Sequence, residues 1–287
     1  MLDVITVLSG EINFGGDTPS RISTHGGGAA ANVASWAAYS KVASHLVARV
    51  GNDAAGQTLL AELKSLKVNS LISINPGEQT GVVVILVDQI GERTMFPDTA
   101  ANAGLTLEDL PTLEDFNAVY ISGYALLNEK SRPGVLAMIE EIGSKGLPIF
   151  FDPTTVGGMS QAPFVEIRSW LPLMTTLIMN EEEARFVSGE IEIERALAEL
   201  LNLAPNVVIK RGALGAVGQS RGQELIYVPA FATIVKDTTG AGDAFAGGFI
   251  AAWMQKAEMK SALEAGAQSA AQCVAIVGAR PQVTTAL

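Results

Sequence analysis

The stretch DTTGAGDAFAGGF at residues 237–249 runs from a glycine-rich turn straight into an apolar helical pattern. Gly240 and Gly242 allow the backbone to bend and to approach a ligand closely. The N–H groups at the start of a helix have no partner within it, so they can hold an anion. Asp243 lies at the same end, where its charge repels a phosphoryl group, and deprotonation of an acceptor hydroxyl is a task that explains its presence. A helix cap would explain Asp243 alone, but not the whole string.

The composition narrows the class of protein. The 287 residues, of which 48% are hydrophobic, are enough for one large α/β domain. A net charge of −11 argues against a nucleic-acid partner. The single Cys273 excludes an internal disulfide and fits a reducing cytoplasm. The N-terminus does not resemble a signal peptide and the longest apolar stretch, 244–254, is too short for a membrane helix, so we expect a cytoplasmic protein without a membrane partner.

Short apolar runs alternate with helical patterns along most of the chain. The strand-like runs are 45–50, 81–88, 118–122, 148–152, 176–180 and 206–210, and the helical patterns are 30–39, 54–66, 133–145 and 193–201. This alternation predicts a three-layer α/β/α fold with a mostly parallel central sheet. Antiparallel strands are expected at 214–219, 224–229 and 231–236, followed by helices at 242–255 and 260–277. Residues 1–287 are expected to form a single domain.

Two segments do not fit a parallel sheet, one at about 4–25 and the other at about 70–100. The second ends in VVVILVDQIGERTMFP, which predicts a hairpin with Gln-Ile-Gly-Glu as its turn. We expect the two segments to form a small β-sheet lid on the main domain. The run 82–87 offers apolar side chains on both faces of its strand, which favours a homodimer joined through the lid.

The string at 237–249 resembles the second signature of the ribokinase-like (PfkB) family of carbohydrate kinases. The resemblance implies that Gly240, Ala241 and Gly242 form an anion hole and that Asp243 is the catalytic base. It also implies that Thr238 lies on the nucleotide side of the site. A motif this long rarely arises by chance.

A second glycine-rich stretch, GGGAAAN at residues 26–32, opens another helical pattern. Taken alone, it is better explained by tight packing of a loop against a helix. It resembles the first signature of the family, however, and the resemblance implies that Gly27, Gly28 and Asn32 contact the hydroxyls of the sugar.

The family begins with an apolar strand and a glycine, followed by an aspartate that binds the substrate. Asp17 lies only 10 positions before Gly27, whereas Asp3 lies 24 positions before it, enough for two strands and their turns. The opening Met1-Leu2-Asp3-Val4 also resembles the end of the family's opening motif, so we assign the substrate carboxylate to Asp3. The family's first strand is then missing, and we expect the natural product to begin about ten residues upstream.

The nucleotide side of the site is implied by two further stretches. Asn180 and Glu183, at the end of the run 176–180, match the family's Asn-x-x-Glu motif, which holds the magnesium–phosphate assembly, often through water. The structural alternative is that they are ordinary acidic residues in a first helical turn, where the helix dipole favours them. The stretch VIKRGALG at 208–215 resembles the strand and turn over the nucleotide, with Lys210 on phosphate and Gly212 and Gly215 allowing close approach.

A monovalent cation is implied near the anion hole. The segment VGARP at 277–281 resembles the loop that helps to hold such an ion, which would be K⁺. Asp237, Thr239 and Gly278 would share that site.

Together these features predict a kinase that uses ATP and Mg²⁺ to phosphorylate a hydroxyl of a small, ribose-like sugar. A nucleoside such as adenosine or pseudouridine is an alternative acceptor in the same chemistry. A non-catalytic sugar- or nucleotide-binding relic is the alternative from another class, although Asp243, Asn180 and Glu183 are all present. A Rossmann dehydrogenase is disfavoured because the glycines at 26–28 lack the required spacing.

Overall fold

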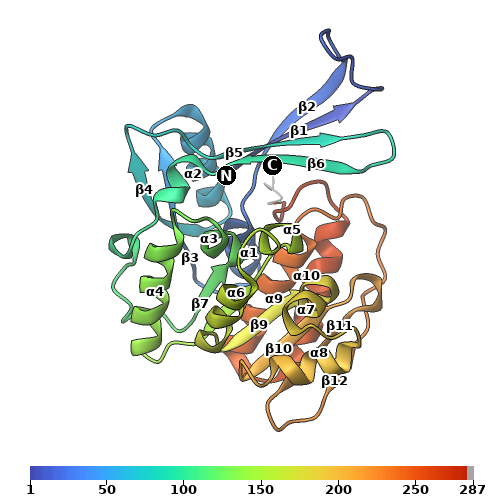
Figure 1. Cartoon of the computed structure of the whole chain (residues 1–287). Coiled ribbons are helices and arrows are strands. Elements are labelled where there is room, and N and C mark those ends of the chain that lie inside the picture. The colour runs from blue at the N-terminus through green and yellow to red at the C-terminus, as the bar shows by residue number, and fades with distance from the viewer. Residues whose placement is uncertain (283–287) are drawn as a thin grey trace.

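The computed structural model describes residues 1–282, in which a layered α/β body carries a projecting β-sheet (Figure 1). The central sheet has the strand order β12-β11-β10-β9-β8-β7, with β7 to β10 parallel and β11 and β12 antiparallel. Its strands are β7 (Val119–Ser122), β8 (Ile149–Asp152), β9 (Thr176–Asn180), β10 (Asn206–Lys210), β11 (Ala216–Ser220) and β12 (Ile226–Val228). The predicted three-layer fold is confirmed. The strand expected at 231–236 is wrong: the segment is exposed, and the chain after it bonds to Val274 instead of to a sheet edge.

Helices cover both faces of this sheet. One face packs against α1 (Ala29–Tyr39), α9 (Ala241–Lys256) and α10 (Met259–Val274). The other packs against α4 (Arg132–Ser144), α6 (Phe164–Trp170), α7 (Glu181–Ser188) and α8 (Ile193–Leu200). Shorter helices are α2 (Ala54–Ser65), α3 (Gly123–Leu127) and α5 (Val156–Met159). Among the described residues, no helix is both long and apolar enough to cross a membrane.

Helix α9, which carries the glycine-rich string, lies between α1 and α10. Its two inner glycines make this close approach possible. A Cβ atom on Gly247 would lie 2.7 Å from the Cβ of Trp36, and one on Gly248 would overlap the hydroxyl of Ser269. The second half of the string therefore serves packing, while its first half faces the site described below.

The projecting sheet, here called the lid, has the strand order β2-β1-β5-β6. Its strands are β1 (Leu2–Leu8), β2 (Ser20–Gly26), β5 (Val82–Val87) and β6 (Arg93–Asp98). β1 pairs antiparallel with β2 and parallel with β5, and β5 and β6 form a hairpin around residues 88–92. The lid contains fewer residues than the sequence predicted. Residues 70–75, which were expected in the lid, belong to β4 (Val68–Asn75), and β4 pairs with β3 (Ser44–Gly51).

The pair β3–β4 forms a separate two-stranded parallel sheet. The sequence predicted the run 45–50 as a strand of the central sheet, but within residues 1–282 its only strand partner is β4. A gap therefore separates the edge of β3 from the edge of β7.

Candidate active site

The carboxyl ends of the central strands, the start of α1, the start of α9 and the lid enclose one large cavity of about 1950 Å³. Open α/β sheets bind their ligands at this edge. Most of the site residues predicted from the sequence line this cavity: Asp3, Gly27, Gly28, Asn32, Asn180, Glu183, Lys210, Gly212, Gly215, Thr238, Thr239, Gly240, Ala241, Gly242 and Asp243. The remaining two, Asp237 and Gly278, bond to each other beside it.

The start of α9 provides a site for an anion. Gly240 is the N-cap and has φ 75°, a left-handed conformation that favours glycine. A Cβ on Gly240 would lie 2.5 Å from the Cβ of Ala279, so no larger residue fits there without a shift. The ammonium group of Lys210 lies close to Gly242 in the first turn of α9. A Cβ built on Gly242 would be 3.1 Å from the Lys210 Nζ. N–H groups of the helix start and a lysine thus converge on the same space, although Ala241 N also bonds to the Thr238 carbonyl (3.3 Å).

Asp243 follows in the first turn of α9 and faces the cavity. The amide of Asn32, from α1, donates a hydrogen bond of 2.8 Å to its Oδ2. Burial raises the pKa of Asp243 to about 7, with a further contribution from the charge of Asp152, although the bond from Asn32 acts in the opposite direction. A carboxylate with a near-neutral pKa is well matched to taking a proton from a hydroxyl.

The lid contributes Asp3 to the opposite wall. Asp3 lies on β1 opposite His25 of β2, and its carboxylate fills the space where a Cβ on Gly27 would be. This contact explains why residue 27 must be glycine. Burial raises the pKa of Asp3, although the amino terminus and Arg280 lower it.

Arg280 connects the wall that carries Asp3 and Gly27 to Asn32, the residue that bonds to Asp243. It was not predicted as a site residue. Its side chain is buried and donates to the carbonyl of Gly27 (2.8 Å) and to Oδ1 of Asn32 (3.2 Å). It also forms an ion pair of 3.1 Å with Glu62. Arg280 therefore fixes the orientation of the Asn32 amide that bonds to Asp243. The sequence gave no sign of this, because the contacts span about 250 residues.

The end of β8 adds a further carboxylate. Asp152 forms an ion pair of 2.5 Å with Lys210. Burial opposes the charge of Lys210, but the carboxylates of Asp152 and Glu183 raise its pKa above the ordinary value. Asp152 was not predicted as a site residue from the sequence. The structure places it beside the predicted phosphate-binding lysine.

Asn180 and Glu183 lie together at the start of α7. Asn180 caps the helix, and its backbone and side-chain nitrogens each donate 2.7 Å bonds to the Glu183 carboxylate. Burial and the charge of Asp152 raise the pKa of Glu183. These hydrogen bonds show that Asn180 and Glu183 cap the start of α7, which is the structural role that the sequence also allowed. Among the described residues, no group of three or more His, Cys, Asp or Glu side chains is arranged to hold a metal.

Two hydroxyl groups on β7 were also missed by sequence reasoning. Tyr120 and Ser122 both line the cavity, and their buried hydroxyl oxygens have no hydrogen-bond partner within the described part of the chain. Burial, together with nearby carboxylates, raises the pKa of Tyr120 well above its usual range. The position of Ser122 at a strand end was a usable signal, whereas Tyr120 lies within the strand. Unpaired polar groups facing a cavity are available to a polar ligand.

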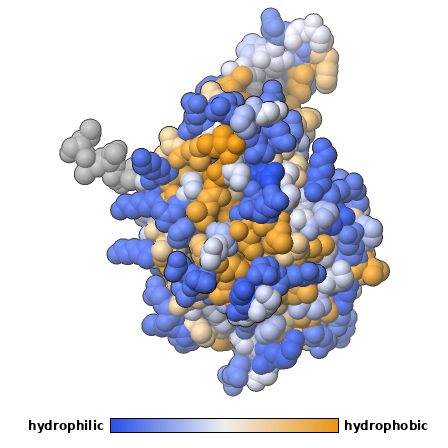
Figure 2. Space-filling view, turned by 90° about the vertical axis from the view of Figure 1, so that its left-hand side faces the viewer, coloured by the Kyte–Doolittle hydropathy of each residue, from blue (hydrophilic) through white to orange (hydrophobic). Residues whose placement is uncertain are grey.

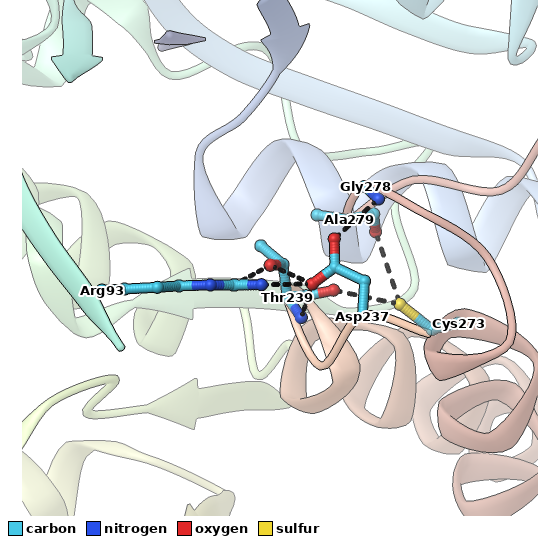
Figure 3. Close-up of polar contacts among 6 residues, drawn as sticks. All are labelled: Arg93, Asp237, Thr239, Cys273, Gly278 and Ala279. Carbon is cyan, nitrogen blue, oxygen red and sulfur yellow. Dashed lines mark hydrogen bonds and ion pairs between the residues drawn. The ribbon is translucent and has the colours of Figure 1, made fainter. Parts of the chain in front are cut away.

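Asp237 lies at the centre of a polar cluster just before the anion site (Figure 3). Its carboxylate accepts bonds from Gly278 N (3.0 Å) and from the backbone and hydroxyl of Thr239 (2.9 and 2.6 Å). Arg93, from β6 of the lid, reaches across to Asp237 at 2.5 Å and also contacts the Thr239 hydroxyl. Burial opposes ionisation of Asp237, but these hydrogen bonds outweigh it and lower its pKa. Arg93 was not predicted from the sequence.

Comparison with known proteins agrees with this geometry. Residues 11–286 match the family described as pfkB family carbohydrate kinase. A fructokinase from Klebsiella pneumoniae is 32% identical over 244 residues, which cover 82% of this chain and 79% of that protein. A protein described as ribokinase II from E. coli, solved with ATP and Mg²⁺, superposes with a TM-score of 0.85 at 26% identity, covering 97% of this chain and 92% of that one. A fructokinase from Vibrio cholerae, solved with fructose, ADP and calcium, gives 0.78 at 25%, covering 96% and 92%.

The chain belongs to the pfkB family of carbohydrate kinases. It is accordingly a phosphotransferase that acts on a sugar hydroxyl, with a ribokinase-like fold.

Proposed function

We propose that the chain transfers the γ-phosphoryl group of ATP to a primary hydroxyl of a monosaccharide, with fructose as the first candidate and ribose as the second. The observation that carries this proposal is the position of Asp243. It combines a near-neutral pKa, a bond from Asn32 and a place at the start of α9. The preference for fructose rests on the similarity to proteins described as fructokinases.

Each wall of the cavity has its own task in this proposal. Asp3, Asn32 and the free hydroxyls of Tyr120 and Ser122 bind and orient the sugar. Asp243 removes the proton of the acceptor hydroxyl as that oxygen attacks the γ-phosphorus. The N–H groups at residues 240–242 stabilise the negative charge that develops on the transferred group.

The nucleotide lies on the Lys210 side of the cavity. Lys210 binds its phosphates, and Gly212 and Gly215 border the space. Mg²⁺ bound with the nucleotide would neutralise charge on its phosphates. Since the Glu183 carboxylate already accepts two bonds from Asn180, we assign it contact with the hydrated ion through water.

A monovalent cation beside Asp237 is part of the proposal. Asp237, Thr239 and Gly278 lie together, and the groups that bond to the Asp237 carboxylate are N–H and O–H donors. The guanidinium of Arg93 already neutralises this carboxylate from the lid. A K⁺ ion would therefore have to share Asp237 with Arg93 or displace it.

An ADP-release assay tests the proposed acceptor. The panel contains fructose, ribose and other monosaccharides, with adenosine and pseudouridine as the alternative class. We expect the highest kcat/KM with fructose and no release above background with Asp243→Asn. A nucleoside as the best acceptor, or an equal rate for the variant, would contradict the proposal.

We also propose a cytoplasmic homodimer joined through the outer face of the lid. Asp3, Val83 and Ile85 face the cavity, so Val84 and its partner Phe96 face outward, where they are 37% and 53% exposed. Such an apolar sheet face favours a partner.

Light scattering at micromolar concentration should then give twice 30.0 kDa. Phe96→Glu should shift the protein to monomer, while Val165→Glu, at a more exposed apolar site on α6, should not. A wild-type protein that stays monomeric would contradict the dimer.

A further inference from the structure

The carboxylate of Asp237 already has a full set of hydrogen-bond donors. Its Oδ1 accepts bonds from the backbone N (2.9 Å) and the hydroxyl (2.6 Å) of Thr239 and from the guanidinium of Arg93 (2.5 Å). Its Oδ2 accepts a bond from Gly278 N (3.0 Å). A carboxylate has about four lone-pair sites. Donors within residues 1–282 therefore already match this capacity, and a further cation would have to remove one of them.

Backbone carbonyl groups of the same two segments are engaged as well. The carbonyl of Thr239 accepts a bond from Cys273 Sγ (3.4 Å), as Figure 3 shows. The carbonyl of Ala279 accepts a bond from Trp36 Nε1 (2.9 Å). K⁺ binds to oxygen atoms whose lone pairs face the ion. These oxygen atoms face donors of the chain, so the cluster as it stands does not fit K⁺.

Arg93 supplies the positive charge in this cluster. Both arms of its guanidinium point at the turn before α9: Nη1 contacts the Thr239 hydroxyl, and Nη2 contacts Oδ1 of Asp237. A guanidinium is planar, carries five N–H donors and stays charged in proteins. Thr239 directly precedes Gly240, the N-cap of α9. The guanidinium therefore holds the turn that presents the N–H groups of α9 to the transferred phosphoryl group.

The face of the lid that carries Arg93 is the face that closes the cavity. On β6, Arg93 and Pro97 point to one face because strand side chains alternate, and Pro97 lines the cavity. Pro97 pairs with Val83, and Val83 pairs with Asp3, the predicted sugar ligand. Residues paired in register share a face, so Asp3 and Arg93 face the body together.

The outer end of the lid projects beyond the body, at the top of Figure 1 and of Figure 2. The bond between Arg93 and Asp237 is thus a contact that joins this projecting sheet to the start of α9. A lid position that brings Asp3 to the sugar also brings Arg93 to Asp237.

We propose that the monovalent cation beside Asp237 is the guanidinium of Arg93, and that the kinase works without K⁺. This assignment rests on the proposed function. Closure of the lid over the sugar places the charge, and opening withdraws it. Arg93 is a positioning residue, because it acts on the anion site through Asp237 and Thr239. The charge beside the anion site is thereby coupled to the binding of the sugar.

Replacement of K⁺ by N-methylglucamine at constant chloride concentration tests the proposal. The proteins compared are the wild type, Arg93→Ala, Arg93→Lys and Arg21→Ala. Arg21, on β2, is the matched control because it lies in the same row across the lid: it pairs with Val7, Val7 pairs with Val87, and Val87 pairs with Arg93. For each protein, we would measure kcat/KM in the ADP-release assay and the melting temperature in both salts.

The wild type and Arg21→Ala should keep the same kcat/KM when K⁺ is removed. Arg93→Ala should lose about 3- to 10-fold in the N-methylglucamine salt, and K⁺ should restore most of this loss. Guanidinium chloride at a concentration too low to unfold the protein should also restore it, since it supplies the missing group. Arg93→Lys keeps the charge but not the planar fork, so its rate should be reduced and yet insensitive to K⁺.

The melting temperature gives a second readout that does not depend on turnover. KCl should raise the melting temperature of Arg93→Ala by about 3 °C over the N-methylglucamine salt and should leave that of the wild type and of Arg93→Lys unchanged. This readout separates the cation from the acceptor. A protein that phosphorylates none of the sugars would contradict the proposed function, while its melting temperatures would still decide whether Arg93 keeps K⁺ out.

The proposal is overturned if removal of K⁺ lowers the rate of the wild type several-fold, or if K⁺ specifically raises its melting temperature. It is also overturned if Arg93→Ala is as insensitive to K⁺ as the wild type in both measurements.

Discussion

Replacement of Asp243 by asparagine should have opposite effects on turnover and on stability. The variant keeps an oxygen that can accept the bond from Asn32 but loses the basic carboxylate. Removal of a general base typically lowers the rate by 10²–10⁴-fold. The same change removes a buried charge from the folded protein, so its effect on stability depends on pH.

The size of that effect follows from the pKa of Asp243. The folded-state value is about 7 and the ordinary value is 3.8. Because the folded-state pKa is the higher one, the neutral carboxyl stabilises the fold fully below about pH 3.8, and this contribution is lost as the pH rises toward 7. A difference of about three pKa units corresponds to at most ~4 kcal/mol at pH 8.

Thermal unfolding at pH 5 and pH 8 measures this contribution. Asp243→Asn should melt on the order of 8 °C above the wild type at pH 8, and the advantage should shrink toward pH 5. Asp17→Asn, at an exposed position in the loop between β1 and β2, serves as the control and should change neither stability nor rate. A variant that is less stable than the wild type at both pH values would refute the argument that burial of the charge sets this pKa. A retained rate would refute the role as base.

Three further changes test the surrounding contacts. Asn32→Ala removes the bond that lowers the pKa of Asp243, so the rising limb of kcat/KM against pH should move to higher pH; an unmoved limb would speak against this coupling. Glu183→Gln should raise the Mg²⁺ concentration needed for half-maximal rate by roughly tenfold, and an unchanged titration would leave helix capping as its only role. Arg93→Ala should raise KM for the sugar and make the rate more dependent on K⁺, by about 3- to 10-fold, whereas Arg21→Ala, also exposed on the lid, should do neither.

The sequence by itself determined the fold class, the family and the chemistry. The strand boundaries 176–180 and 206–210 were predicted to the residue, because short apolar runs between helices have few other interpretations. Asp243 and the glycines before it could be identified because a turn that binds phosphate at a helix start needs those residue types in consecutive positions. These signals are local, so a single stretch of chain carries them.

Tertiary structure alone decided which distant residues complete the site. Arg280 orients Asn32, Asp152 pairs with Lys210, and Arg93 crosses from the lid to Asp237. None of these pairs has a characteristic spacing, because each joins segments that meet only after the sheet and its helices have packed. Only the packed structure shows the gap between the edges of β3 and β7, into which the cavity extends. A gap is a property of the surrounding elements, and no residue of the printed chain encodes it.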